Sequence, residues 1–295
     1  MIMIHAVKMD EIQSAMLSVT SACRDSISSY FSENLQINSR VDATLNDLLG
    51  YFSDRSQAIS HLVSCGYAWD AEIILRCAYE TAAKIWLICL TPDDTRDRLV
   101  EEFWGISAEI HNRKKARQAS FAKQLHISRN NQHDSRVFAF LEDRTIFHQD
   151  EINKKERKAI EQKWSFTEIV NYLEANHPID FPMRYVTGLL FNYGTASHLI
   201  HADDHALDLM LDRELRDPEE LALLMLTHTL RIWSDLVSLW FMSSETLRYR
   251  FGIKGRNAKL YEQVEKFQGL GAPIKEQFDQ MQEHFYNNWP DNKGG

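Results

Sequence analysis

The sequence predicts an all-α protein that is built as a multi-helix bundle. Apolar residues recur at helical spacing along most of the chain, and no stretch shows a persuasive alternation of the β-strand kind. The 295 residues include only 11 Gly and 6 Pro, which is too few for the many turns of a β fold. With 44% hydrophobic residues, the chain can bury a sizeable core. We expect one helical domain over residues 1–295.

The expected helices follow one another from the N-terminus to the C-terminus. In chain order they cover residues 8–35, 42–65, 68–90, 92–124, 150–163, 166–176, 183–201, 204–214, 218–249, 256–268 and 273–287. The first two are amphipathic, and Asp42 is a suitable cap for the second. Gly66 precedes the third helix, which is the most apolar. At the start of the fourth, Thr91-Pro92-Asp93-Asp94 combines a capping residue, a proline and two acids at the positive end of the helix dipole.

The second half of the chain carries similar boundary signals. Residues 126–134 are polar and are expected to form a loop, whereas Ser165 and Glu168 form a capping box at a helix start. Asp217-Pro218-Glu219-Glu220 repeats the start signal of the fourth helix. The helices over 68–90, 183–201 and 218–245 are apolar on most faces and should form the centre. We expect the core over about 42–125 and 183–249, an insertion over 126–180 and C-terminal helices over 255–288.

Two charged residues lie inside the most apolar helix. Arg76 and Glu80 are one turn apart, and Lys84 continues the same stripe. Buried charges are costly unless they are paired or have a function. One interpretation is an ion ladder that fixes the alignment of the bundle. The other is a polar site in which Arg76 holds an anionic group and Glu80 orients it or a neighbouring base.

A second polar row occupies the later apolar helix. Tyr193, Ser197 and His201 are four residues apart, so they share one face of that helix. We expect the two rows to face each other, with all five residues as candidate catalytic groups. His198, His201 and His205 also share a face, and three imidazoles can bind a transition metal. Ligands on one helix rarely converge on one ion, so we favour a hydrogen-bonded histidine at the helix end and expect no metal and no cofactor.

The charge of the chain is uneven. The net charge is −9, which argues against a general polyanion-binding surface. From His111 to Arg136, however, basic residues predominate. This basic strip can hold RNA, or it can be a solvated helix end. The candidate nucleic-acid contacts are Arg113, Lys114, Lys115, Arg117 and Lys123.

The two polar rows together resemble a large family of bacterial helical proteins of unknown function. In that family an R-x-x-x-E helix and a Y-x-x-x-S-x-x-x-H helix recur in one domain, as Arg76–Glu80 and Tyr193–Ser197–His201 do here. The resemblance covers about 45–245 and implies that these five residues are the polar signature. Family members often have Pro or Gly after the histidine, whereas Ala202 follows here. The family implies no activity.

A more distant resemblance is to HEPN helical bundles, whose signature is R-x(4–6)-H. Many of these are metal-independent RNases of toxin and phage-defence systems. The match in this sequence is Arg55-Ser-Gln-Ala-Ile-Ser-His61, and Arg76 with His201 can supply the same pair of groups from different helices. The resemblance implies a HEPN-like core with additional N- and C-terminal helices, in which Arg steadies a phosphate and His activates a ribose 2′-hydroxyl.

Other classes of function lack their sequence signals. There is no G-x-x-x-x-G-K-[ST], G-x-G-x-x-G, G-x-S-x-G or H-E-x-x-H motif, and the four cysteines form no C-x-x-C pair. Neither a signal peptide nor an uninterrupted apolar span is apparent, so we expect a cytoplasmic protein without membrane contact. We expect a helical effector of a bacterial toxin or phage-defence system that binds or cleaves RNA. The alternative is a non-catalytic module that binds a protein from the same operon or forms a homo-oligomer.

Overall fold

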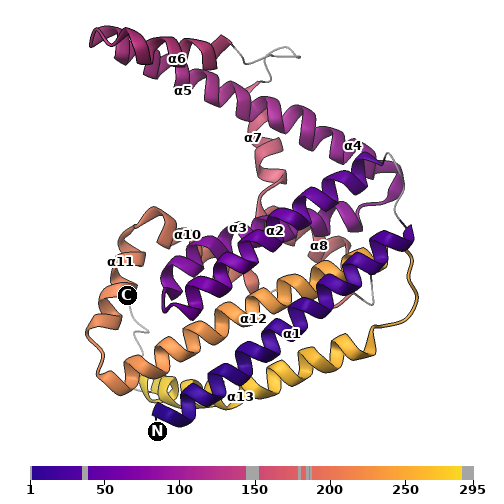
Figure 1. The fold of residues 1–295 in the computed structure, drawn as a ribbon, viewed down its shortest axis with the longest axis vertical. Coiled ribbons are helices and arrows are strands. Elements are labelled where there is room, and N and C mark those ends of the chain that lie inside the picture. The colour runs from indigo at the N-terminus through magenta and orange to yellow at the C-terminus, as the bar shows by residue number, and fades with distance from the viewer. Residues whose placement is uncertain are drawn as a thin grey trace, which may run out of the picture. The chain divides into compact units, whose positions relative to one another are not determined.

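The computed structural model describes residues 2–34, 39–143, 153–178, 181–183, 186 and 188–287. Within these ranges the regular secondary structure is helical and no strand occurs (Figure 1). The chain divides into two compact units, which are described separately. The first unit combines residues 1–90 and 170–295, and the second covers residues 91–169. The second unit therefore begins well before the insertion that the sequence suggests at 126–180.

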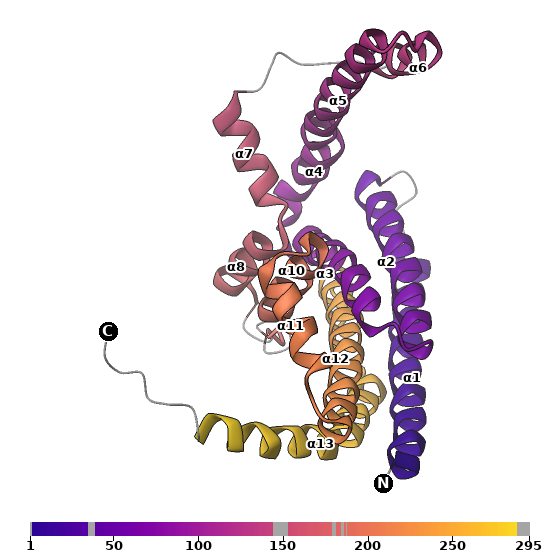
Figure 2. The same cartoon turned by 90° about the vertical axis from the view of Figure 1, so that its left-hand side faces the viewer.

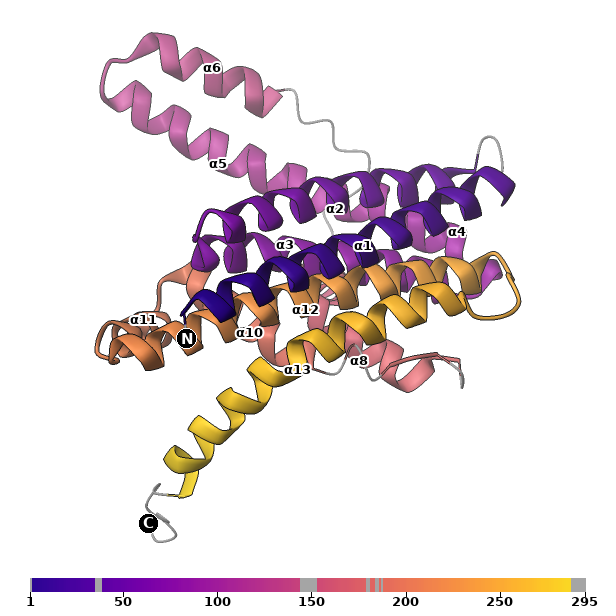
Figure 3. The same cartoon turned by 60° about the horizontal axis from the view of Figure 1, so that its bottom comes forward.

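The first unit is a bundle of long helices. Its helices are α1 (Ile2–Asn34), α2 (Arg40–Ser64), α3 (Ala68–Leu90), α10 (Leu189–His201), α11 (Asp204–Glu214), α12 (Pro218–Arg250) and α13 (Ala258–Asn287). Helix α3 packs against α2, α10 and α12, whereas α1 packs against α12 and α13 (Figures 1 and 3). Helices α3 and α12 lie at the centre, as expected, since more than half of the residues of each are buried. Helix α10 is less central than expected, because only Leu189, Ala196 and Leu199 of its residues are buried.

Helices α3 and α12 run in the same direction along each other. Three hydrogen-bonded pairs join them: Glu72 with His228, Tyr79 with Asp235, and Trp86 with Ser243. Successive pairs are two helical turns apart on both helices. All six residues are buried. Polar pairs at this repeat align α3 with α12.

The expected cap of α2 is wrong. The Ser39 hydroxyl, not Asp42, accepts a backbone hydrogen bond at the helix start, from the Asp42 N–H at 3.2 Å. The Asp42 carboxylate is instead buried and lies 2.5 Å from a guanidinium nitrogen of Arg250. The expected start of α12 is confirmed, because Asp217 accepts hydrogen bonds from the N–H groups of residues 219 and 220.

The two C-terminal helices expected at 256–268 and 273–287 form one helix, α13. Pro273 lies inside it. The C-terminal part of α13 extends away from the other helices of the first unit (Figures 2 and 3). At Gly271 a Cβ atom would lie 2.8 Å from Cδ1 of Leu230, so α13 approaches α12 too closely there for a side chain. The helix continues through the proline because Ile274 and the residues before it bury an apolar face against the bundle.

The second unit contains α4 (Asp93–Glu102), the π-helical turn η1 (Phe103–Ser107), α5 (Ala108–Ser128), α6 (Gln132–Asp143), α7 (Lys154–Lys163) and the start of α8 (Phe166–Asn176). The loop expected at 126–134 is wrong, since α5 and α6 form an antiparallel pair joined by a short turn (Figure 3). Asn130 makes this turn in the left-handed conformation, with φ of 56°. The capping box of α8 is confirmed by a 3.4 Å hydrogen bond from the Glu168 N–H to Ser165.

None of the helices in the described ranges combines the length and the hydrophobicity that crossing a bilayer requires.

Candidate functional site

The two polar rows meet at Glu80. Arg76 donates from Nε to Oε1 of Glu80 at 3.2 Å, and the Tyr193 hydroxyl donates to the same oxygen at 3.0 Å. The Arg76 guanidinium lies over the Tyr193 ring, 5.3 Å from its centroid. We call these three residues the outer cluster. It joins α3 to α10 across 113 residues of sequence.

The outer cluster is only partly buried. The side chains of Arg76 and Glu80 are 21% and 36% exposed. Burial disfavours the charged guanidinium, but Tyr193 and Glu80 outweigh it, so the pKa of Arg76 is raised. Burial and the neighbouring Glu80 both raise the pKa of Tyr193, which keeps its phenol protonated. The cluster therefore offers a fixed cation and a neutral hydroxyl on a half-exposed patch.

The other members of the predicted rows lie apart from this cluster. Ser197 is half-buried and His201 is exposed, and neither has a hydrogen bond to the described residues. His201 is eight residues from Tyr193, which is about 12 Å along the helix. Lys84 forms no ion pair within the described part of the chain, and burial lowers its pKa. The structure brings together Arg76, Glu80 and Tyr193.

A buried network lies behind the outer cluster. Asp235 accepts hydrogen bonds from the Tyr79 hydroxyl at 2.7 Å, from Nδ2 of Asn192 at 3.0 Å and from Arg231 at 3.3 Å. The Tyr79 ring meets the Tyr193 ring edge to face, with the centroids 6.1 Å apart. Both tyrosines therefore connect the surface patch to groups on α12.

Asp235 is the most perturbed carboxyl of this network. Burial raises its pKa to about 6, although Arg231 and the hydrogen bond from Tyr79 oppose the shift. Burial of the Tyr79 side chain, together with the negative charge of Asp235, raises the pKa of Tyr79 well above its usual value. A carboxyl that titrates near 6 in the core makes the network responsive to pH.

Glu72 extends the network along α3 by two turns from Tyr79. It is fully buried, accepts a hydrogen bond from Arg231 and lies 3.0 Å from Nε2 of His228. Burial alone would raise its pKa, but His228 and Arg231 outweigh that effect and lower it. If Nε2 carries the proton towards Glu72, Nδ1 of His228 is an acceptor; that atom is buried and has no partner among the described residues. We call Glu72, Tyr79, Asn192, His228, Arg231 and Asp235 the inner cluster.

The histidines at the end of α10 are arranged by a local hydrogen bond. Nδ1 of His198 lies 2.6 Å from Oδ2 of Asp203, and the rings of His198 and His205 are 4.7 Å apart. The hydrogen bond from His198 lowers the pKa of Asp203. Within the described ranges, no group of three His, Cys, Asp or Glu side chains is arranged to hold a metal ion.

The basic strip of the second unit is largely paired with acids. Arg113 lies 2.6 Å from Glu109, Lys114 lies 2.5 Å from Glu161, and Lys123 pairs with Glu142. These carboxylates compete with any phosphate for the same cations. Arg117 is exposed on the same helix and also has a contact of its own.

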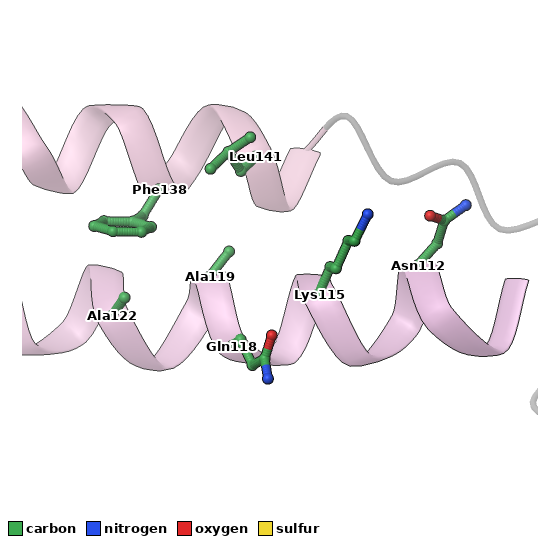
Figure 4. Close-up of a pocket in the computed structure, with 7 residues that line it drawn as sticks. All are labelled: Asn112, Lys115, Gln118, Ala119, Ala122, Phe138 and Leu141. Carbon is green, nitrogen blue, oxygen red and sulfur yellow. The ribbon is translucent and has the colours of Figure 1, made fainter. Parts of the chain in front are cut away.

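Lys115 has a different setting from its neighbours in the strip. It lines a pocket of about 550 Å³ between α5 and α6. Phe138 of α6 lies over Ala119 and Ala122 of α5 (Figure 4). Lys115 lies on α5 one turn before Ala119, towards one end of the pocket. No ion pair joins Lys115 to the described residues, so it is the best placed of the five candidates for an external anion.

The sequence matches a family of unknown function, DUF5677, over residues 43–219, which is more than half of the chain. The chain belongs to the DUF5677 family. The match spans α3 and α10, and hence every residue of the outer cluster. The resemblance to a helical family of unknown function is thereby confirmed. No curated protein and no solved structure matches the chain.

The inner cluster of this DUF5677 chain was not apparent from the predicted rows. Its signal is present, however, in the spacing of charged residues within two apolar helices. Glu72 lies one turn before Arg76 on α3, and His228, Arg231 and Asp235 follow the i, i+3, i+7 pattern of one face of α12. The burial argument that singles out Arg76 applies equally to these four.

Proposed function

We propose that the outer cluster binds the phosphate backbone of RNA and supports its cleavage without a metal ion. On this proposal the chain has a HEPN-like core and acts in the cytoplasm as the effector of a bacterial toxin or phage-defence system. The observation that carries the proposal is the half-exposed grouping of a guanidinium, a carboxylate and a phenol around Oε1 of Glu80. Such a grouping is what phosphate binding and proton transfer require.

Arg76 and Glu80 have defined parts in the proposed reaction. Arg76 binds the non-bridging oxygens of the phosphate. It stabilises the negative charge that builds up on them when the 2′-oxygen adds to phosphorus. Glu80 accepts the proton of the ribose 2′-hydroxyl through Oε2, which receives no hydrogen bond from the described residues. The 2′-oxygen bonds to phosphorus, and the 5′-oxygen leaves and takes a proton from water. The products are a 2′,3′-cyclic phosphate and a 5′-hydroxyl.

His201 in the first unit and the basic residues of the second unit are each proposed to contact RNA. His201 is about 12 Å along α10 from Tyr193, too far to act on the same phosphate, so it is proposed to contact a more distant part of the RNA backbone. Lys115 and the other basic residues of α5 are proposed to make backbone contacts without sequence preference. These contacts would weaken steeply as the salt concentration rises.

A cleavage assay on structured and unstructured RNA tests the proposal. We expect products with cyclic phosphate ends from the wild-type protein in the presence of EDTA, and about a hundredfold loss or more in Arg76→Gln and Glu80→Gln. Arg216→Gln is the matched control, because Arg216 also forms an i,i+4 pair, with Glu220 at 3.5 Å. Absence of cleavage by the wild type, or equal cleavage by all variants, would overturn the proposal.

A second candidate is a non-catalytic module that forms a homo-oligomer or binds a protein from the same operon. It is favoured by the apolar side chains that α5 and α6 expose, with Phe121 64% and Phe140 55% exposed. Light scattering on the wild type and on Phe121→Ser/Phe140→Ser tests it. A dimeric or larger wild type and a monomeric variant would support assembly through this surface, and a monomeric wild type would exclude self-association.

A further inference from the structure

A separate pocket lies in the first unit, among α1, α2 and α12. Its volume is about 370 Å³, within the range of small-molecule sites. Thr20 and Arg24 from α1, Gln57 and Ser60 from α2, and Trp240 from α12 contribute to its lining. It shares no residue with the outer or the inner cluster. On α1 the lining residues recur at i, i+3, i+4 and i+7, so one face of that helix forms a wall.

Arg24 is the only ionisable residue in this lining. Its guanidinium lies over the Trp240 ring, 4.9 Å from the centroid, and its Nε is buried without a hydrogen-bond partner. No ion pair joins Arg24 to the described residues, and burial lowers its pKa. A partly desolvated cation without a carboxylate partner is costly to the folded protein, and an incoming anion would offset that cost.

The indole that forms one wall is fixed in place. Nε1 of Trp240 donates to the Ser56 hydroxyl at 3.0 Å, and the ring packs on Phe52 with the centroids 4.4 Å apart. The hydroxyls of Thr20 and Ser60 donate to backbone carbonyls on their own helices. The donors left for a ligand are those of Arg24, the Ser21 hydroxyl and the Gln57 amide, of which the amide also donates to Ser53 at 3.5 Å. They lie beside the fixed indole of Trp240.

We propose that this pocket binds a small organic anion through a carboxylate or phosphate group. Arg24 provides the charge-assisted hydrogen bonds, and the Gln57 amide donates to the same group. The apolar part of the ligand lies against Trp240 and Leu236. The site is independent of RNA cleavage at the outer cluster, because the residues of the two sites do not overlap.

Isothermal titration calorimetry of the full chain with sodium phosphate and with sodium benzoate tests this site. A titration with sodium chloride at equal ionic strength is the control. We expect saturable binding of at least one of the two anions. Binding should weaken by about tenfold or more in Arg24→Gln, since a charge-assisted hydrogen bond is lost. Tighter binding of phosphate would assign the site to phosphate esters, and tighter binding of benzoate to carboxylates with an apolar body.

Arg55→Gln is the matched control. Arg55 also stacks on an aromatic ring, that of Tyr51 at 5.1 Å, and its Nε is also buried without a partner, but it does not line the pocket. Ser60→Leu fills the pocket while it leaves Arg24 in place, and should abolish binding. Melting temperatures without ligand identify any variant that fails to fold. The proposal is overturned if neither anion saturates the wild type, or if folded Arg24→Gln and Ser60→Leu bind as the wild type does.

Discussion

The Tyr79 hydroxyl donates a 2.7 Å hydrogen bond to Asp235 and so joins α3 to α12 inside the first unit. Tyr79 is fully buried, and Asp235 is almost so. At one end of this bond, burial raises the pKa of the Asp235 carboxyl. At the other end, the Tyr79 ring contacts the Tyr193 ring of the outer cluster. Tyr79 thus joins the buried carboxyl of Asp235 to the outer cluster.

Removal of this hydroxyl should destabilise the protein. In Tyr79→Phe the buried carboxyl of Asp235 loses a donor, and we expect the free energy of unfolding to fall by about 1–3 kcal/mol. Urea denaturation followed by circular dichroism measures the change. Tyr67→Phe, at a side chain that is 59% exposed, is the control and should have little effect. Equal effects of the two substitutions would contradict a structural role for the bond.

The stability should depend on pH through Asp235. Its pKa is raised from 3.8 to about 6 in the folded protein, so between these values the folded state binds more protons than the unfolded state. The contribution of this group therefore falls as the pH rises through that window, with a slope of up to about 1.4 kcal/mol per pH unit. In Asp235→Asn this slope should be absent. Denaturation at several pH values between 4 and 7 measures it, and a pH-independent difference between the two proteins would refute the assignment.

The contribution of Glu72 to stability should depend on pH in the opposite direction. Its pKa is lowered, so the stability that it contributes is present above its usual pKa of 4.5 and is lost as the pH falls through the lower folded value. Glu72→Gln removes one of the two buried carboxylates that pair with Arg231, the other being Asp235, and we expect a cost of about 3–5 kcal/mol at neutral pH. A double-mutant cycle with Arg231→Met isolates the pair, since the second substitution should then cost much less. Additive effects would show that the two residues are not coupled.

The close approach of α13 to α12 gives a steric prediction. Gly271→Ala places a Cβ atom 2.8 Å from Cδ1 of Leu230, and we expect a loss of about 1–3 kcal/mol. Gly269→Ala meets nothing within 4 Å and should be neutral or stabilising, because alanine favours the helix. Thermal unfolding compares the two. Leu230→Ala should reduce the additional cost of Gly271→Ala, and no such relief would place the cause elsewhere.

Local patterns account for most of the helices. The apolar run and its flanking signals predict α3 with the bounds that the structure has, and the Asp217 signal predicts the start of α12. The loop expected at 126–134 was wrong because most of this polar segment is helical. Only a turn of a few residues around Asn130 separates α5 from α6. The break expected near Pro273 was wrong because burial of an apolar face outweighs the lost backbone hydrogen bond.

The candidate site could be predicted only in part. The Arg76–Glu80 pair follows from an i,i+4 spacing, which sequence displays directly. That Tyr193 joins Glu80 depends on how α10 packs on α3, and that Asp235 joins Tyr79 depends on a contact across 156 residues. Helical periodicity gives the face of each helix but not its offset along a neighbour. The position of His201 beyond the outer cluster depends on the same offset.

The polar pairs between α3 and α12 also discriminate against misfolded states. If α12 slid two turns along α3 in one direction, Glu72 would face Asp235 and two buried carboxylates would repel each other. A slide the other way would place Glu72 against Leu221, where no group could pair with its charge. Two long apolar helices without such pairs would have several nearly equivalent registers. Here a slipped register leaves buried charges unpaired, so the native register is favoured over its neighbours.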